Sequence, residues 1–123
     1  MLSFAVPAAL AALAAGCGQS GIQVPKNDPA YQGAVLFQEH CSGCHSLAAV
    51  DAQGSRNPDE VKYTYRTNGP NFNTRPEMKS SVLFAIRNGG FSGAIMPANV
   101  VVGQDAQQVA DFVSKYAGGQ APK

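Results

Sequence analysis

Two cysteines and a histidine stand at a spacing that can carry out specific chemistry: Cys41, Cys44 and His45, in the run C-S-G-C-H. Two thiols three positions apart can each add to a vinyl group of one porphyrin, and the imidazole that follows can bind its iron. With three Cys and two His in 123 residues, chance would produce this pattern on the order of once in a thousand such compositions. The spacing predicts one covalent haem c, attached through Cys41 and Cys44, with His45 as an axial ligand.

Two other uses of these cysteines are disfavoured by their surroundings. Structural zinc takes four thiolate or imidazole ligands, usually in two spaced pairs, and elsewhere the chain offers only Cys17 and His40. A thioredoxin-like dithiol needs a βαβ frame, whereas the flanking sequence has the pattern of helices and loops. Haem attachment is therefore the preferred interpretation.

Met96 is the candidate for the second axial ligand. It stands in the run F-S-G-A-I-M-P at residues 91–97, a glycine-containing loop that ends in proline. A thioether is a soft ligand, and Met opposite His stabilises reduced iron and fills its coordination sphere. A lone Met is more often core filler, which is the interpretation given to Met78 on its helix. A filled sphere favours electron transfer over binding of oxygen or peroxide, so no enzymatic activity is expected.

Three amphipathic segments predict an all-α fold that positions these groups. The first opens at Asp28-Pro29, a carboxylate N-cap followed by a proline, and its apolar stripe leads to Cys41. The second is expected to begin with a capping box at 74–77 and to stop at 88–90. The third is expected to begin with a capping box at Asp105 and Gln108 and to end at 118–119. Its apolar face consists of Val109, Phe112, Val113 and Tyr116.

Gly33 marks the place where the first and last helices are expected to meet. A glycine inside a helix costs stability and permits close approach of another helix. We therefore expect Phe112 to pack over Gly33 and Phe37.

Residues 1–16 are interpreted as a signal peptide. The run 2–15 is uncharged, rich in Ala and Leu, and shorter than the roughly 20 residues of a membrane span. Residues 13–17, L-A-A-G-C, resemble the bacterial lipoprotein box, which predicts a lipid on Cys17 and a flexible tether through residue 27. The chain lacks the early Lys or Arg of most export signals, so an ordinary cleaved signal and a retained anchor stay open. Each alternative places the domain outside the cytoplasm.

The charge balance excludes one class of partner. Nine Lys and Arg against eight Asp and Glu give a formal charge of +1, and two ionised haem propionates would change it to about −1. No basic stripe is present, so no nucleic-acid partner is expected.

The ordered motifs resemble those of a class I c-type cytochrome over residues 28–119, with 120–123 as a tail. The resemblance rests on Gly33 and Phe37, C-x-x-C-H, Gly69-Pro70-Asn71-Phe72, the middle helix, Ile95-Met96-Pro97 and Phe112. It implies three main helices around one covalent haem, with the N- and C-terminal helices crossing. It also implies axial His45 and Met96, thioether bonds from Cys41 and Cys44, and a hydrogen bond from His45 to the carbonyl of Pro70.

Residues 52–68 depart from the family pattern because they lengthen the stretch between His45 and Pro70. They include Arg56, Lys62, Tyr63, Tyr65 and Arg66, which could cover a haem edge or bind propionates. A solvated loop is an equal alternative.

The expected function is that of a membrane-tethered, single-haem electron carrier at the outer face of the bacterial cytoplasmic membrane. Its expected partners are a quinol-oxidising or other donor complex and an acceptor such as a terminal oxidase. A permanent cytochrome c subunit of a respiratory or dehydrogenase complex is the main alternative. A haem enzyme or gas sensor with an open iron site is the third possibility.

Overall fold

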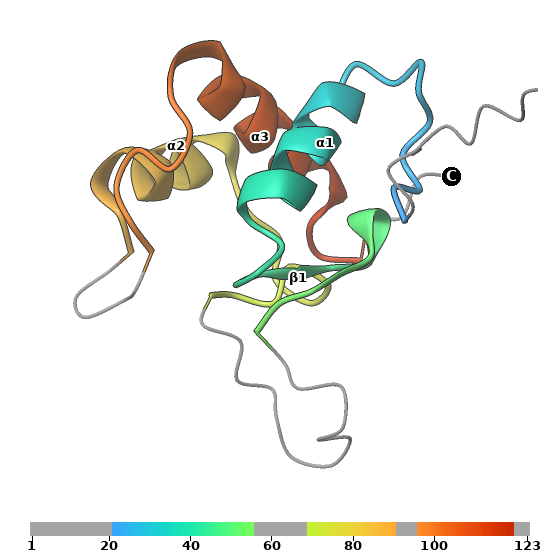
Figure 1. The fold of residues 1–123 in the computed structure, drawn as a ribbon, viewed down its shortest axis with the longest axis horizontal. Coiled ribbons are helices and arrows are strands. Elements are labelled where there is room, and N and C mark those ends of the chain that lie inside the picture. Colours follow the sequence, from blue (N-terminus) through green and yellow to red (C-terminus); the bar gives the residue numbers. More distant parts are fainter. Residues whose placement is uncertain (1–20, 56–68, 91–95, 120–123) are drawn as a thin grey trace, which may run out of the picture.

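The computed structural model describes residues 21–55, 69–90 and 96–119, and three helices dominate them (Figure 1). These are α1 (Tyr31–His40), α2 (Lys79–Asn88) and α3 (Gly103–Tyr116). A two-residue antiparallel pair, β1 (Ser46–Leu47) and β2 (Ala52–Gln53), flanks the short 3-10 helix η1 (Ala48–Val50). The all-α prediction is therefore confirmed. Residues 62–65, the best strand candidate in the sequence, lie outside the described ranges.

Helix α3 packs against both α1 and α2 (Figure 1). It approaches α1 most tightly at Gly33. A Cβ built at Gly33 would lie 2.7 Å from Cβ of Phe112, and closer still to the carbonyl oxygen of Gln108. The Phe112 ring meets the Phe37 ring edge-on, with centroids 5.5 Å apart. The predicted crossing and the packing of Phe112 are both confirmed.

The crossing leaves no room for a side chain at Gly33, so Gly33→Ala should lower stability. Alanine is the better helix former by about 1 kcal/mol, but overpacking a tight core typically costs about 1–3 kcal/mol. The backbone of α3 cannot yield as a flexible side chain would, so we expect the cost to exceed the gain. Denaturant unfolding of the holoprotein measures the difference, with Gln32→Ala at the exposed neighbouring position as the control. Equal or higher stability of Gly33→Ala would contradict the tight crossing.

The starts of the helices differ from the sequence predictions. Helix α1 begins at Tyr31, because Asp28 accepts the N–H of Ala30 in a turn that precedes the helix. Helix α2 begins at Lys79, after Met78, and α3 begins at Gly103. None of the three has a side-chain hydrogen bond at its N-cap, so the predicted capping boxes were wrong.

The ends of α2 and α3 agree better with the prediction, because a glycine with a positive φ follows each of them. Helix α2 stops at Asn88 and is followed by Gly89 with φ +81°. Helix α3 stops at Tyr116, two residues before Gly118 with φ +79°. Positive φ values of this kind end a helix and strain most other residues.

Residues 21–27 belong to the folded domain, which corrects the predicted tether over 17–27. Val24 is 3% exposed within the core, and the N–H of Gln23 donates to the carbonyl of Ala49 at 2.8 Å. The sequence prediction missed this because small and polar residues surround Ile22 and Val24, whose apolar side chains pack on the core. Any tether after Cys17 is therefore limited to residues 18–20. Residues 1–20 and 120–123 lie outside the described ranges, and no helix within those ranges is long and apolar enough to cross a membrane.

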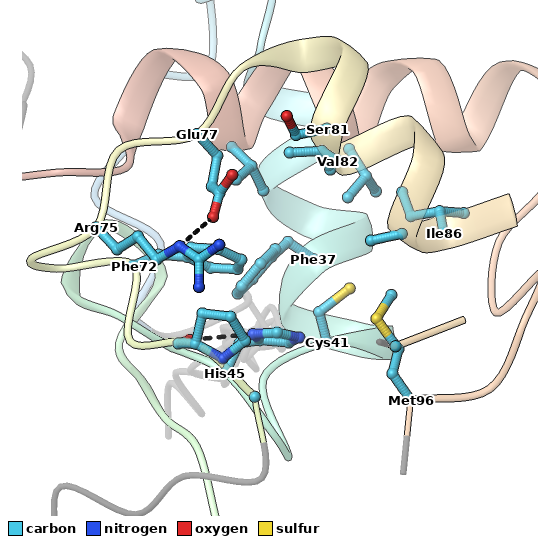
Figure 2. A pocket seen from close by; sticks show the side chains of 16 residues that line it. Phe37, Cys41, His45, Phe72, Arg75, Glu77, Ser81, Val82, Ile86 and Met96 are labelled. Atoms are coloured by element: carbon cyan, nitrogen blue, oxygen red, sulfur yellow. Dashed lines mark hydrogen bonds and ion pairs between the residues drawn. The ribbon is translucent and has the colours of Figure 1, made fainter. Parts of the chain in front are cut away.

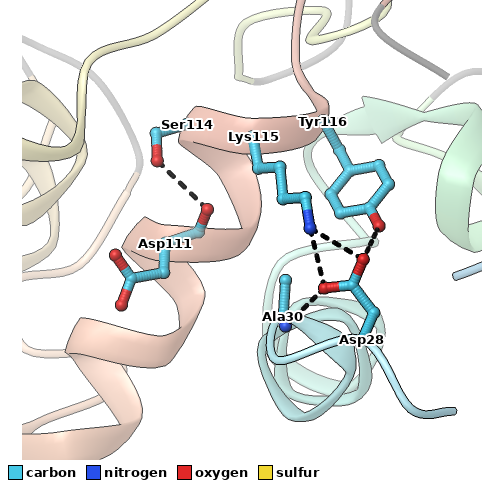
Figure 3. A network of polar contacts seen from close by, with 6 residues as sticks. All are labelled: Asp28, Ala30, Asp111, Ser114, Lys115 and Tyr116. Carbon is cyan, nitrogen blue, oxygen red and sulfur yellow. Dashed lines mark hydrogen bonds and ion pairs between the residues drawn. The ribbon is translucent and has the colours of Figure 1, made fainter. Parts of the chain in front are cut away.

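Asp28 joins the start of α1 to the end of α3 (Figure 3). Its Oδ2 accepts hydrogen bonds from Lys115 Nζ at 2.7 Å and from Tyr116 Oη at 2.6 Å. Its Oδ1 accepts from the N–H of Ala30 at 2.8 Å. The hydrogen bond from Lys115, followed by those from Tyr116 and Ala30, lowers the pKa of Asp28 from 3.8 to about 2.

The lowered pKa of Asp28 predicts a defined pH window for its contribution to stability. The folded state favours the ionised carboxylate, so the contribution is fully present above the ordinary pKa near 4 and is lost as pH falls toward about 2. Asp28→Asn should lower the free energy of unfolding at pH 7, and the difference from wild type should shrink between pH 4 and pH 2. Unfolding titrations across that range measure it. A difference independent of pH would show that the ionised carboxylate does not stabilise the crossing.

Candidate functional site

The turn after α1 buries Cys41 and His45 of the C-x-x-C-H motif and leaves Cys44 exposed. The N–H of Cys41 still bonds back to Phe37, and the N–H groups of Cys44 and His45 both donate to the carbonyl of Cys41, at 3.1 and 3.0 Å. Cys41 is buried, whereas Cys44 is exposed. The chain thus folds back on itself, with one thiol against the core and the other at the surface.

The imidazole of His45 is buried and held by its backbone surroundings. Its Nδ1 donates to the carbonyl of Pro70 at 3.1 Å, the contact implied by the resemblance to c-type cytochromes. A Cβ at Gly69 would lie 2.7 Å from Nε2 and nearer still to Nδ1 and Cε1, so only glycine fits there. The N–H of Gly69 donates to the carbonyl of Cys44 at 3.1 Å, which ties this loop to the motif.

The protonation state of His45 suits a metal ligand. Burial lowers the pKa of His45, against the opposing effects of the Pro70 hydrogen bond and the Glu77 carboxylate. A neutral imidazole that donates from Nδ1 has its lone pair on Nε2. The remaining nitrogen is therefore prepared to bind iron, and the bond to a carbonyl increases its basicity.

Met96 reaches the same cavity from the other side (Figure 2). Its carbonyl accepts the N–H of Gly90 at 3.1 Å, and the N–H of Asn99 donates to the carbonyl of Ile86 at 2.6 Å. A Cβ at Gly89 would lie 2.9 Å from the Met96 carbonyl oxygen. Backbone contacts at Met96 itself and at Asn99 thus fasten the methionine to the end of α2.

The cavity between these groups has a volume of about 320 Å³ and mostly apolar walls. The thiol of Cys41, the ring of His45 and the thioether of Met96 all line it (Figure 2). The apolar walls come from α1, α2, α3 and the loop before α2: Phe37, Phe72, Val82, Ile86, Val109 and Val113. Burial, together with the neighbouring Cys44, raises the pKa of Cys41 to about 12, so its thiol is protonated.

These groups fit a covalently attached haem and no simpler metal site. A flat apolar ring needs hydrocarbon walls, a thiol for attachment and one ligand from each side, all of which line the cavity. Within the described ranges, no group of three or more His, Cys, Asp or Glu side chains could hold a metal ion by itself.

Arg75 and Glu77 also line the cavity, and the sequence analysis missed both. Nε of Arg75 lies 2.6 Å from Oε1 of Glu77, with the Arg75 side chain 59% exposed and the Glu77 side chain 13% exposed. The guanidinium is a suitable group to receive an ionised propionate. The signal in the sequence was a cation just after the Pro70 loop, but Glu77 had been assigned to a capping box. Arg56, Lys62 and Arg66, the cations proposed for the 52–68 insert, lie outside the described ranges.

Comparison with known families and structures decides the identity of this fold. The family model for cytochrome c matches residues 30–116. The chain belongs to the cytochrome c family. The c-type cytochrome SorU from Sinorhizobium meliloti is similar to it, with 31% sequence identity and a TM-score of 0.56. That match covers 74% of this chain and 93% of SorU. No significant match was found among curated proteins.

Membership of the family establishes the cofactor and the general activity of this class I c-type cytochrome. It binds haem c covalently, and Cys41 and Cys44 fit the attachment site. Haem c supplies one-electron chemistry through its iron, so the protein functions in electron transfer. The three helices and the crossing of the terminal helices are those expected of the family. Cys17, the predicted lipid site, lies outside the described ranges.

Proposed function

We propose that this cytochrome is a single-haem electron carrier, with His45 and Met96 as axial ligands, that is tethered outside the cytoplasm by a lipid on Cys17. The main support is that His45 and Met96 line one cavity together with the attachment residue Cys41. Both candidate ligands are held by backbone contacts from neighbouring loops. Two protein ligands leave no position for a substrate, which favours electron transfer over catalysis at the iron.

The short tether would keep the domain against the membrane. Gly21 is already packed beside Asp51, and only four peptide steps separate it from Cys17. Four extended steps span at most about 14 Å. A lipid on Cys17 would therefore hold this cytochrome within about one domain radius of the bilayer and raise its effective concentration at membrane partners.

Cys17→Ser is expected to release the domain from membranes into the soluble extracytoplasmic fraction. Serine cannot carry the thioether-linked lipid, so the anchor is lost while the haem site is unchanged. Fractionation followed by haem staining measures the distribution, and labelling with a radioactive fatty acid tests lipidation directly. Ser20→Ala, in the same segment, is the matched control and should stay membrane-bound. Retention of Cys17→Ser at the membrane would favour an uncut N-terminal anchor.

The proposed partners are a quinol-oxidising or other donor complex and an acceptor such as a terminal oxidase. The exposed turn at Gly43 and Cys44 offers a small surface next to the haem attachment site, which suits the brief encounters of redox proteins. Extraction in mild detergent followed by size-exclusion chromatography tests this role. Elution as a small single-haem species supports a mobile carrier. Stable comigration with a larger haem or copper complex would instead identify a permanent subunit.

A further inference from the structure

The ring of Phe72 lies face to face with the imidazole of His45. Their centroids are 4.7 Å apart and their planes differ by 11°, and both side chains line the cavity (Figure 2). Phe72 is 7% exposed and His45 is 8% exposed. Two rings at this separation form an aromatic stack. The stack covers one face of the imidazole with hydrocarbon.

Phe72 is fixed to two separate parts of the fold. Its N–H donates to the carbonyl of Ser46, the residue after His45, at 2.9 Å, and its carbonyl accepts the N–H of Gly118 at 2.7 Å. The ring of Phe37 meets that of Phe72 edge-on, with centroids 6.0 Å apart. Phe72 therefore cannot shift without moving either the strand that follows His45 or the turn that ends α3.

The imidazole turns about its Cβ–Cγ bond, and several contacts limit that rotation. The hydrogen bond from Nδ1 to the carbonyl of Pro70 holds one atom of the ring, and the backbone at Gly69 approaches the ring closely. Phe37 approaches at a tilt of 53°, with centroids 6.2 Å apart. A parallel ring at 4.7 Å restricts the turn, because rotating the imidazole would press its edge into the Phe72 face.

We propose that Phe72 is a positioning residue that fixes the plane of the His45 imidazole and keeps water from the hydrogen bond between Nδ1 and Pro70. The proposal rests on the proposed role of His45 as an axial ligand and adds that an aromatic stack sets the orientation of that ligand. The plane of an axial imidazole controls its orbital overlap with iron and hence the spread of unpaired spin over the porphyrin. Contact-shifted haem methyl resonances of the oxidised protein report that spread directly.

The test compares Phe72→Leu with Phe112→Leu in the oxidised holoprotein. Both wild-type rings are buried and both pack against Phe37, but among these two only Phe72 stacks on His45. We expect Phe72→Leu to change the order or spread of the haem methyl shifts. We also expect the Nδ1 proton of His45 to exchange with solvent about two- to ten-fold faster, the factor that corresponds to the loss of one aromatic pair. Phe72→Tyr, which keeps the ring, should resemble wild type.

The outcomes separate a positioning role from simple packing. An unchanged methyl pattern and exchange rate in Phe72→Leu would overturn the proposal, as would equal changes in Phe112→Leu. Phe72→Met, whose longer and more flexible side chain adapts better to the space left by the ring, replaces Phe72→Leu, with the same expectations, if the leucine variant does not accumulate. The wild-type spectrum is the separate check on the axial ligands. If it lacked the signals of iron-bound His and Met, the proposed function itself would fail before any variant is compared.

Discussion

Replacing Met96 with alanine is expected to leave the haem covalently attached but to lower its midpoint potential by on the order of 0.1 V or more. A thioether opposite imidazole stabilises reduced iron, and alanine has no atom that can replace the sulfur. Among the described residues, no Met, His or Lys other than His45 and Met96 lines the cavity, so no neighbouring side chain is placed to replace the sulfur. The variant should also bind carbon monoxide rapidly in the reduced state, because one iron position is then open. Redox titration and carbon monoxide difference spectra measure both effects.

Met78→Ala is the matched control for this prediction. Met78 is 70% exposed, precedes α2 and does not line the cavity, so its removal should leave potential and spectra unchanged. Unaltered potential and no carbon monoxide binding in Met96→Ala would instead assign the second ligand to another residue. Rapid carbon monoxide binding by the wild type at neutral pH would favour a haem enzyme or gas sensor over a carrier.

His45→Ala is expected to impair haem assembly more than Met96→Ala does, so that little low-spin holoprotein forms. The imidazole is buried, and its Nδ1 is committed to the carbonyl of Pro70, which leaves Nε2 as the nitrogen for iron. Its loss also empties the space between Phe72 and Gly69, which removes packing as well as a ligand. The yield of haem-containing protein and the absorption spectrum of what remains measure the result.

His40→Ala provides the comparison, because His40 is exposed at the end of α1, five residues earlier in the chain. It should mature normally with wild-type spectra. A normal low-spin spectrum in His45→Ala would contradict the ligand assignment. A failure of both variants would indicate that any change near the attachment motif blocks maturation.

The sequence was sufficient to predict the roles of residues whose chemistry or size allows few alternatives. The C-x-x-C-H spacing allows few alternatives, and Gly33 in a helical stripe has a cost that only a close crossing explains. The apolar face of α3 was also predicted correctly, because its period is unambiguous and its members are buried. In each case local chemistry and tertiary packing favour the same structure.

Features that depend on where a loop lies in the folded protein could not be predicted. Glu77 was assigned to a helix cap, but it pairs with Arg75 beside the cavity. Val24 was placed in a tether, but it is buried in the core. The role of Phe72 depends on its stack with His45 and on the N–H of Gly118, far along the chain. A single sequence gives no local sign of these placements, because each depends on which part of the fold the loop or segment packs against.

Absorption spectroscopy of the mature protein, before and after extraction with acid acetone, tests the central claim most directly. The predicted result is a low-spin reduced spectrum and an oxidised spectrum with a sulfur-to-iron charge-transfer band in the red. The pigment should stay with the precipitated protein, because Cys41 and Cys44 hold it through thioether bonds. A colourless protein, or a pigment that passes into the acetone, would contradict covalent attachment. A stable pigment without the charge-transfer band would contradict ligation by Met96.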